Sequence, residues 1–127
     1  MPDIKYSNDE IGEKYSKVKN YWQVVQGAVK EMQRQVGDLQ TDEKGVAERG
    51  LIIRHLILPN RIAGSKKVLD FIHSEISKNA YVNIMEQYYP SFNAGKFDEL
   101  NRRITIDEYE EVVFYAKIIG LNRAANH

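Results

Sequence analysis

Apolar side chains recur at spacings of three and four positions in three parts of the chain, which is the period of an amphipathic helix. The first part runs from 20 to 36, and the second begins at Ser65. The third follows Thr105, whose spacing to Glu108 matches a capping box, and it stops at Gly120. We therefore predict three helices.

Two other segments lack this period and consist mainly of strand-forming residues. The run 51–58 (LIIRHLIL) is apolar nearly throughout, as in a strand buried on both faces. The run 81–88 (YVNIMEQY) alternates and leads into a long loop at 91–103, while the polar stretch 38–50 favours a loop or small hairpin. A short strand remnant is possible at 2–6.

The predicted order of helix, strand, helix, strand, helix favours βα units and a parallel sheet, so the fold class is α/β. A chain of 127 residues is one domain at most. Right-handed connections place every helix on one side of such a sheet. The other face is then open, and we expect something to cover it.

The amino-acid composition argues against several classes of function. The 18 basic and 18 acidic residues balance, so no overall charge points to nucleic acid as a partner. The longest apolar run is far shorter than the roughly 20 residues that cross a bilayer, and the first ten residues do not resemble a secretory signal, so we expect no membrane span and a cytoplasmic location. Without cysteine, the chain alone has no thiolate for zinc or an iron–sulfur cluster.

Strand alternation sorts the polar residues in the strands onto one face, away from the helices. That face carries Asp3, Lys5, Arg54, Asn83 and Gln87. Carboxylate, cationic and amide groups together suit a polar, amino-acid-like ligand. A structural pair between Arg54 and Asp3 explains two of these residues equally well.

Four further polar or aromatic residues are candidates for the site, but we expect a structural or surface role for each. His55 falls on the helix side, where a hydrogen-bonded core histidine is expected rather than a catalytic one. Tyr88 could line the mouth of a pocket, although aromatic side chains at strand ends are usually packing residues. Arg102 and Arg103 precede the last helix, where we expect a surface role.

Several motifs in series resemble the C-terminal half of radical S-adenosylmethionine (radical SAM) proteins, nearest to those related to pyruvate formate-lyase-activating enzyme. They are 50–60 (GLIIRHLILPN), Ala63-Gly64-Ser65, 81–90 (YVNIMEQYYP), and 102–113 with its RRIT and EYEEVV segments. The opening PDIKY resembles the end of that family's fourth barrel strand. The resemblance covers nearly the whole chain.

The resemblance implies a partial parallel βα barrel: residues 1–127 would be the last three βα units of a radical SAM (βα)6 barrel. Family members bind a [4Fe-4S] cluster through three cysteines and cleave S-adenosylmethionine to a radical that abstracts hydrogen from the target. This chain has no cysteine, so it departs from the family there. It is expected to supply cofactor and substrate walls without the cluster, and to be inactive alone.

The resemblance also implies site residues. Asp3 and Lys5 match the family's Asp-x-Lys beside S-adenosylmethionine, and Arg54 matches an arginine that faces the same cofactor. Gln87 or Tyr88 falls near a position where activating enzymes carry a histidine. Together with Asn83, these form the expected cofactor-binding set.

The chain alone is expected to bind neither cofactor tightly. Its expected partners are the missing N-terminal half of the barrel or a second copy through the open sheet face, and a protein substrate is a further candidate. Two other functions compete with the radical SAM hypothesis. One is a stand-alone, non-catalytic α/β protein-binding module, and the other is a binder of small metabolites.

Overall fold

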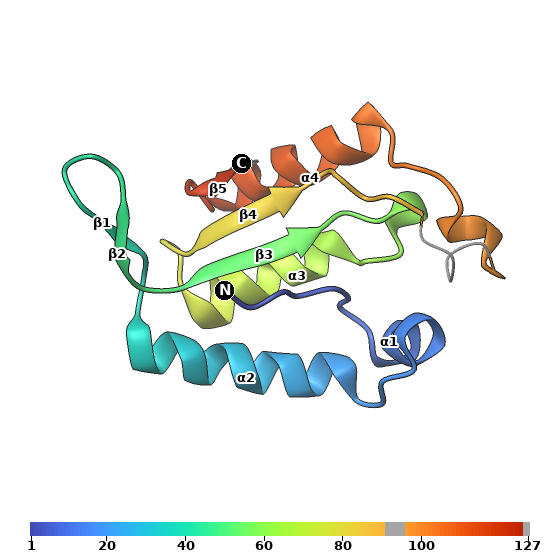
Figure 1. The fold of residues 1–127 in the computed structure, drawn as a ribbon, viewed down its shortest axis with the longest axis horizontal. Helices are drawn as coiled ribbons and strands as arrows, with labels where there is room; N and C mark the ends of the chain where they lie inside the picture. The colour runs from blue at the N-terminus through green and yellow to red at the C-terminus, as the bar shows by residue number, and fades with distance from the viewer. Residues whose placement is uncertain (91–95, 126–127) are drawn as a thin grey trace.

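Three parallel strands form the central sheet of the computed structural model, which describes residues 1–90 and 96–125 (Figure 1). They are β3 (Ile52–Leu56), β4 (Tyr81–Met85) and β5 (Ala124–Ala125), in the spatial order β3-β4-β5. Asp3 forms an isolated parallel bridge with Arg54, so the first residues of the chain lie along the other edge of β3. Strand order in space therefore follows strand order in the sequence.

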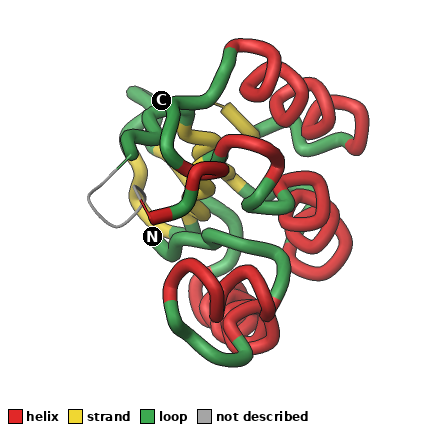
Figure 2. The backbone as a smooth tube through the Cα atoms, turned by 90° about the vertical axis from the view of Figure 1, so that its right-hand side faces the viewer, coloured by secondary structure: helices red, strands yellow, loops and turns green. Residues whose placement is uncertain are grey.

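Helices connect the parallel segments. They are α1 (Asp9–Ser16), α2 (Tyr21–Val36), α3 (Ser65–Phe71), which continues as a π-helical turn (Ile72–Ile76), and α4 (Ile106–Ile119). Figure 2 shows the long helices together on one side of the strands. Short 3-10 turns at Pro59–Arg61 and Asp98–Leu100 complete the loops after β3 and β4.

A small antiparallel hairpin extends away from the parallel sheet (Figure 1). It consists of β1 (Gln40–Thr41) and β2 (Ala47–Arg49), and the Asp42 carboxylate accepts hydrogen bonds from the amides of Lys44 and Val46 in its turn. The expected α/β class is confirmed, and of the two alternatives for 38–50, a loop or a small hairpin, the structure has the hairpin.

Other expectations need correction. Both central strands are shorter than predicted, because the chain bends away after Leu56 and Met85. Neither helix α1 nor β5 was predicted, and β5 pairs with Val82 and Asn83 of β4. Within the predicted loop 91–103, residues 91–95 lie outside the described part of the chain.

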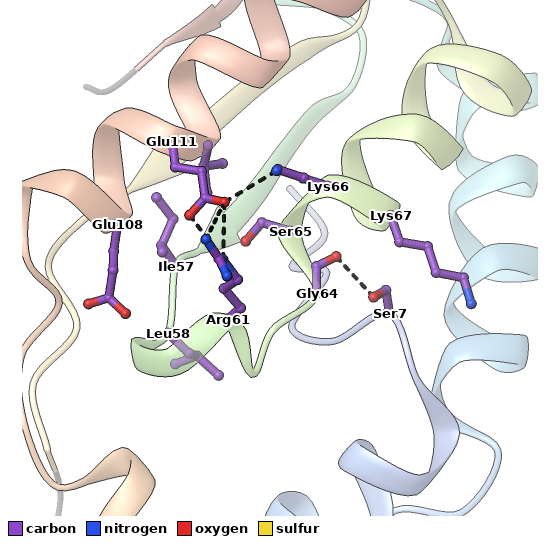
Figure 3. Close-up of a pocket in the computed structure, with 11 residues that line it drawn as sticks. Ser7, Ile57, Leu58, Arg61, Gly64, Ser65, Lys66, Lys67, Glu108 and Glu111 are labelled. Carbon is purple, nitrogen blue, oxygen red and sulfur yellow. Dashed lines mark hydrogen bonds and ion pairs between the residues drawn. The ribbon is translucent and has the colours of Figure 1, made fainter.

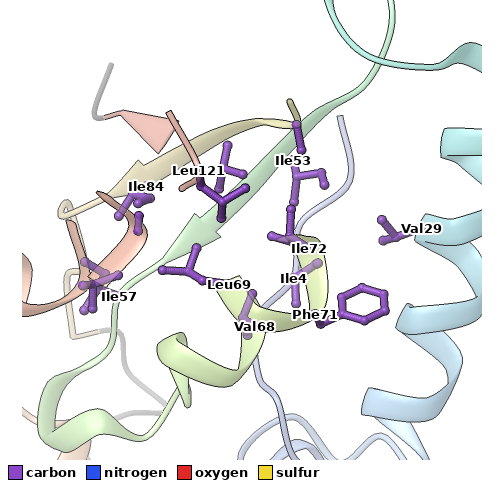
Figure 4. Packing of buried hydrophobic residues seen from close by; sticks show 14 of the residues in the cluster. Ile4, Val29, Ile53, Ile57, Val68, Leu69, Phe71, Ile72, Ile84 and Leu121 are labelled. Carbon is purple, nitrogen blue, oxygen red and sulfur yellow. The ribbon is translucent and has the colours of Figure 1, made fainter. Parts of the chain in front are cut away.

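The core lies between the sheet and the helices (Figure 4). Ile53, Ile57, Val82 and Ile84 are buried on the helix side, where they pack with Leu69 and Ile72 and other members of the same cluster. Fully burying each large side chain contributes about 1.5 to 3 kcal/mol. On the opposite face, Ile52, Arg54, Leu56, Asn83 and Met85 are only partly covered. The alternation expected from the sequence is therefore confirmed.

A second apolar cluster closes the carboxyl ends of the strands. Its buried members are Tyr6, Leu58, Ala63 and Leu100. Leu58 is only 8% exposed because the other members of this cluster surround it. Helix α1 contributes to the cover, since the rings of Tyr15 and Phe97 stack edge to face at 4.8 Å.

Candidate functional site

A row of polar residues crosses the open face of the sheet from strand to strand. Asp3 lies opposite Arg54 through its backbone bridge, and Arg54 is the parallel partner of Asn83. The guanidinium of Arg54 forms an ion pair with the Asp3 carboxylate, with Nε and Oδ1 3.1 Å apart. Sequence alternation predicted that these residues share a face, and the strand register brings the three side by side.

The polar atoms of this row are not all satisfied. The Asp3 and Arg54 side chains are 42% and 38% exposed, so their ion pair is solvated and contributes about 0 to 1 kcal/mol. Asn83 differs, because its Oδ1 is buried and has no hydrogen-bond partner among residues 1–90 and 96–125. A buried acceptor without a partner costs about 1 to 3 kcal/mol, which a donor from a ligand would recover.

The other predicted site residues are spread toward the carboxyl ends of the strands. Lys5 has an exposed side chain, and its amide donates to the Tyr21 hydroxyl at 2.7 Å. Gln87 is exposed beyond the end of β4. Tyr88 packs against the second cluster and donates its hydroxyl to the carbonyl of Leu100 at 2.9 Å, and burial raises the pKa of this phenol. The structure therefore brings Asp3, Arg54 and Asn83 together, but it gives Tyr88 a packing role.

His55 is a core residue, as expected. Its ring is fully buried, with Nδ1 2.6 Å from the Ile4 carbonyl and Nε2 2.8 Å from the Ser65 hydroxyl. The carbonyl only accepts, so Nδ1 carries the proton and Nε2 accepts from Ser65. Burial lowers the pKa of the imidazole, which stays neutral and links the N-terminal segment to α3.

A charged network around the turn after β3 was not predicted as a unit. The backbone amide of Asn60 donates to Glu108, and the Asn60 side chain bonds both the Glu99 carbonyl and Arg102. Arg102 also donates to both Glu108 oxygens, which lowers the pKa of that carboxyl to about 2. The capping box formed with Thr105 was predicted, but nothing in the local pattern indicated that Glu108 also binds the turn.

The described residues contain neither a cluster of metal ligands nor a helix that could span a membrane. Within residues 1–90 and 96–125, no group of three or more histidine, aspartate or glutamate side chains could hold a metal ion. None of the helices in this described part is long and apolar enough to cross a bilayer.

Comparison with known proteins finds a longer protein that this chain resembles over part of that protein's length. The chain matches no protein-family model, and no solved structure is significantly similar to it. It is 32% identical over 123 residues to an uncharacterized protein of Methanocaldococcus jannaschii. The aligned region is 96% of this chain but 32% of that protein, so the chain spans about a third of the length of this relative.

Proposed function

We propose that this chain supplies the last three βα units of a radical SAM-type barrel, as a wall for S-adenosylmethionine and substrate. The observation that carries the proposal is the row of Asp3, Arg54 and Asn83 on the uncovered face of the sheet. These residues belong to the set that the sequence resemblance assigns to the cofactor.

The topology agrees with a barrel segment. Parallel strands that follow one another in both space and sequence, with helices on one side, are the arrangement of a singly wound βα barrel. An open doubly wound sheet would instead reverse its strand order and carry helices on both faces. The relative is about three times as long as the aligned region, which leaves room there for further βα units.

The row also fits the amino-acid end of S-adenosylmethionine. The carboxylate of Asp3 suits an ammonium group, Arg54 suits a carboxylate, and the unpaired Oδ1 of Asn83 can accept a hydrogen bond. A [4Fe-4S] cluster does not fit this chain, because thiolates hold such clusters and the sequence has no cysteine. The cluster would therefore belong to another part of the barrel, where it supplies the electron for cofactor cleavage.

We expect S-adenosylmethionine to bind this chain alone in the millimolar range, roughly 4 kcal/mol, because only part of the binding wall is present. A titration followed by amide chemical shifts should perturb Asp3, Arg54 and Asn83. Arg54→Ala should abolish these changes. Arg34→Ala is the matched control, since Arg34 also pairs with a carboxylate, that of Glu31, but on the outer surface of α2.

Two results would contradict this proposal. One is micromolar affinity that survives Arg54→Ala, which would place the ligand elsewhere. The other is a set of shift changes confined to the loops after β3 and β4, with the row unaffected.

A second candidate function is a non-catalytic protein-binding module, favoured by the apolar side chains on the same open face. Ile52, Leu56 and Met85 are partly exposed there. Leu56 packs partly against the second cluster, whereas Met85 belongs to neither core cluster. Such a patch favours a covering partner, either the rest of a barrel or a second copy of the chain.

We expect the isolated chain to self-associate through this face, so that its sedimentation coefficient rises with protein concentration in the micromolar range. Met85→Lys should remove the rise, because a lysine on the contact face must be desolvated. Ile118→Lys, on the exposed side of α4, serves as the control. A monomer at all concentrations, unchanged by Met85→Lys, would contradict association through the open face.

A further inference from the structure

A cavity of about 340 Å³ lies on the helix side of the sheet, apart from the polar row (Figure 3). It opens between the turn after β3, the start of α3 and the first half of α4. Its apolar wall is formed by Ile57, Leu58 and Val112. This volume is at the lower end of the range for small-molecule sites, so it suits a small ligand with an apolar part.

The mouth of the cavity has more positive than negative charge. Arg61 donates from Nε to both oxygens of Glu111, at 3.0 and 3.2 Å, and the ammonium of Lys66 lies 3.2 Å from the same carboxylate. Figure 3 shows both cations converging on Glu111, while Lys67 points away. Two cations share one anion, which leaves a net charge of +1.

Glu108, the other acidic residue of the lining, does not cancel this excess. Its carboxylate is already paired with Arg102, with 2.8 Å between Nη1 and Oε1. The cavity mouth therefore favours a ligand with a single negative charge.

The backbone at the mouth adopts a costly conformation. Asn60 and Arg61 both have positive φ angles, of 60° and 58°, although neither is glycine. A non-glycine residue in this region costs of order 1 kcal/mol or more, and such positions cluster at functional sites. The three hydrogen bonds of Asn60 to the Glu99 carbonyl, Arg102 and Glu108 hold the turn, which presents Arg61 beside Glu111.

We propose that this cavity binds a small carboxylate with an apolar tail. The tail would lie against Ile57, Leu58 and Val112, and the carboxylate would accept hydrogen bonds from Arg61 and Lys66 at the mouth. One carboxylate would neutralise the single excess positive charge, whereas a phosphate dianion would leave one negative charge without a partner, and a neutral compound would gain nothing from the excess cation. The inference does not depend on the function proposed for the open face.

The test uses hexanoate and its uncharged analogue hexanamide, each titrated into the full chain and followed by amide chemical shifts. Hexanoate should perturb Ile57, Ser65 and Val112, and it should bind about tenfold more tightly than hexanamide, as for one charged hydrogen-bonding interaction. Equal affinities for the two probes would overturn the proposal. So would the absence of saturable shifts at the cavity, or shifts centred on Asn83.

Two variants should change the affinity for hexanoate in opposite directions, which loss of folding does not explain. Lys66→Met should weaken binding about tenfold by removing a donor, and Glu111→Gln should strengthen it by a similar factor by removing the competing anion. Lys30→Met is the matched control, because it breaks a lysine–glutamate pair with Glu75 outside the cavity. Unchanged affinity in both cavity variants would overturn the assignment of the mouth.

Discussion

Gly64→Ala should lower the free energy of unfolding by about 2 to 4 kcal/mol. Gly64 has a φ of +63°, where an L side chain costs roughly 1 to 2 kcal/mol. An added Cβ would also lie 2.0 Å from Oγ of Ser7, which donates to the Gly64 carbonyl at 2.9 Å. Because Ser7 is only 4% exposed, it has little space to move away. Urea denaturation followed by circular dichroism measures the loss.

Gly27→Ala provides the matched control with the opposite sign. Gly27 lies in the exposed part of α2, and nothing stands within 4 Å of an added Cβ. Alanine should therefore stabilise the protein by about 0.5 to 1 kcal/mol. In a Ser7→Ala background, the cost of Gly64→Ala should fall toward the backbone contribution alone. A cost unchanged by Ser7→Ala would show that the close contact with Oγ is not responsible.

The main helices and strands could be predicted because the spacing of their apolar residues follows which side chains are buried. Ile53 and Ile57 lie against the helices while Arg54 lies opposite, as two-residue alternation requires. The capping box of Thr105 is likewise local, since its partners are three residues apart.

The elements that were missed depend on distant contacts. Helix α1 is short and mostly polar, so it has no strong pattern of its own. It packs through the buried Gly12, where an added Cβ would lie only 2.6 Å from Cβ of Tyr21. The two alanines of β5 have no pattern of their own, and they form a strand only because β4 offers a free edge. The π-helical turn depends on the amide of Ser77, which bonds the carbonyl of Ile72.

The sequence likewise predicted only part of the candidate site. Alternation indicated that Asp3, Arg54 and Asn83 share a face, but only the register between strands makes them neighbours. The cavity mouth joins Arg61 and Glu111, which are fifty residues apart in the chain. Single-sequence patterns do not contain such a pairing, and the left-handed backbone at Asn60 has no signal in residue type beyond the preference of asparagine for turns.

His55→Leu is the second substitution with a large expected effect, a loss of about 2 to 6 kcal/mol in the free energy of unfolding. The leucine would remove the hydrogen-bond partner of both the Ile4 carbonyl and the Ser65 hydroxyl in the core. Each buried polar group without a partner costs about 1 to 3 kcal/mol. Chemical denaturation of the variant near pH 7.5 measures the loss.

A double-mutant cycle separates this contact from general packing. Ser65→Ala alone should cost about 1 to 2 kcal/mol, because His55 Nε2 loses its donor. The double variant should cost less than the sum of the two single variants, since the same hydrogen bond is removed twice. Strict additivity would show that His55 and Ser65 do not interact.

The same histidine should make stability depend on pH. Burial lowers the folded-state pKa of His55, whereas the unfolded chain titrates near 6.5. As the pH falls below about 6.5, the unfolded state therefore binds a proton that the folded state excludes, and stability declines by up to about 1.4 kcal/mol per pH unit until the folded pKa is reached. The free energy of unfolding measured between pH 7.5 and 5.5, where ordinary carboxylates stay almost fully ionised, should show this decline, and His55→Leu should flatten it. An equal slope in both proteins would mean that the buried imidazole does not control acid stability.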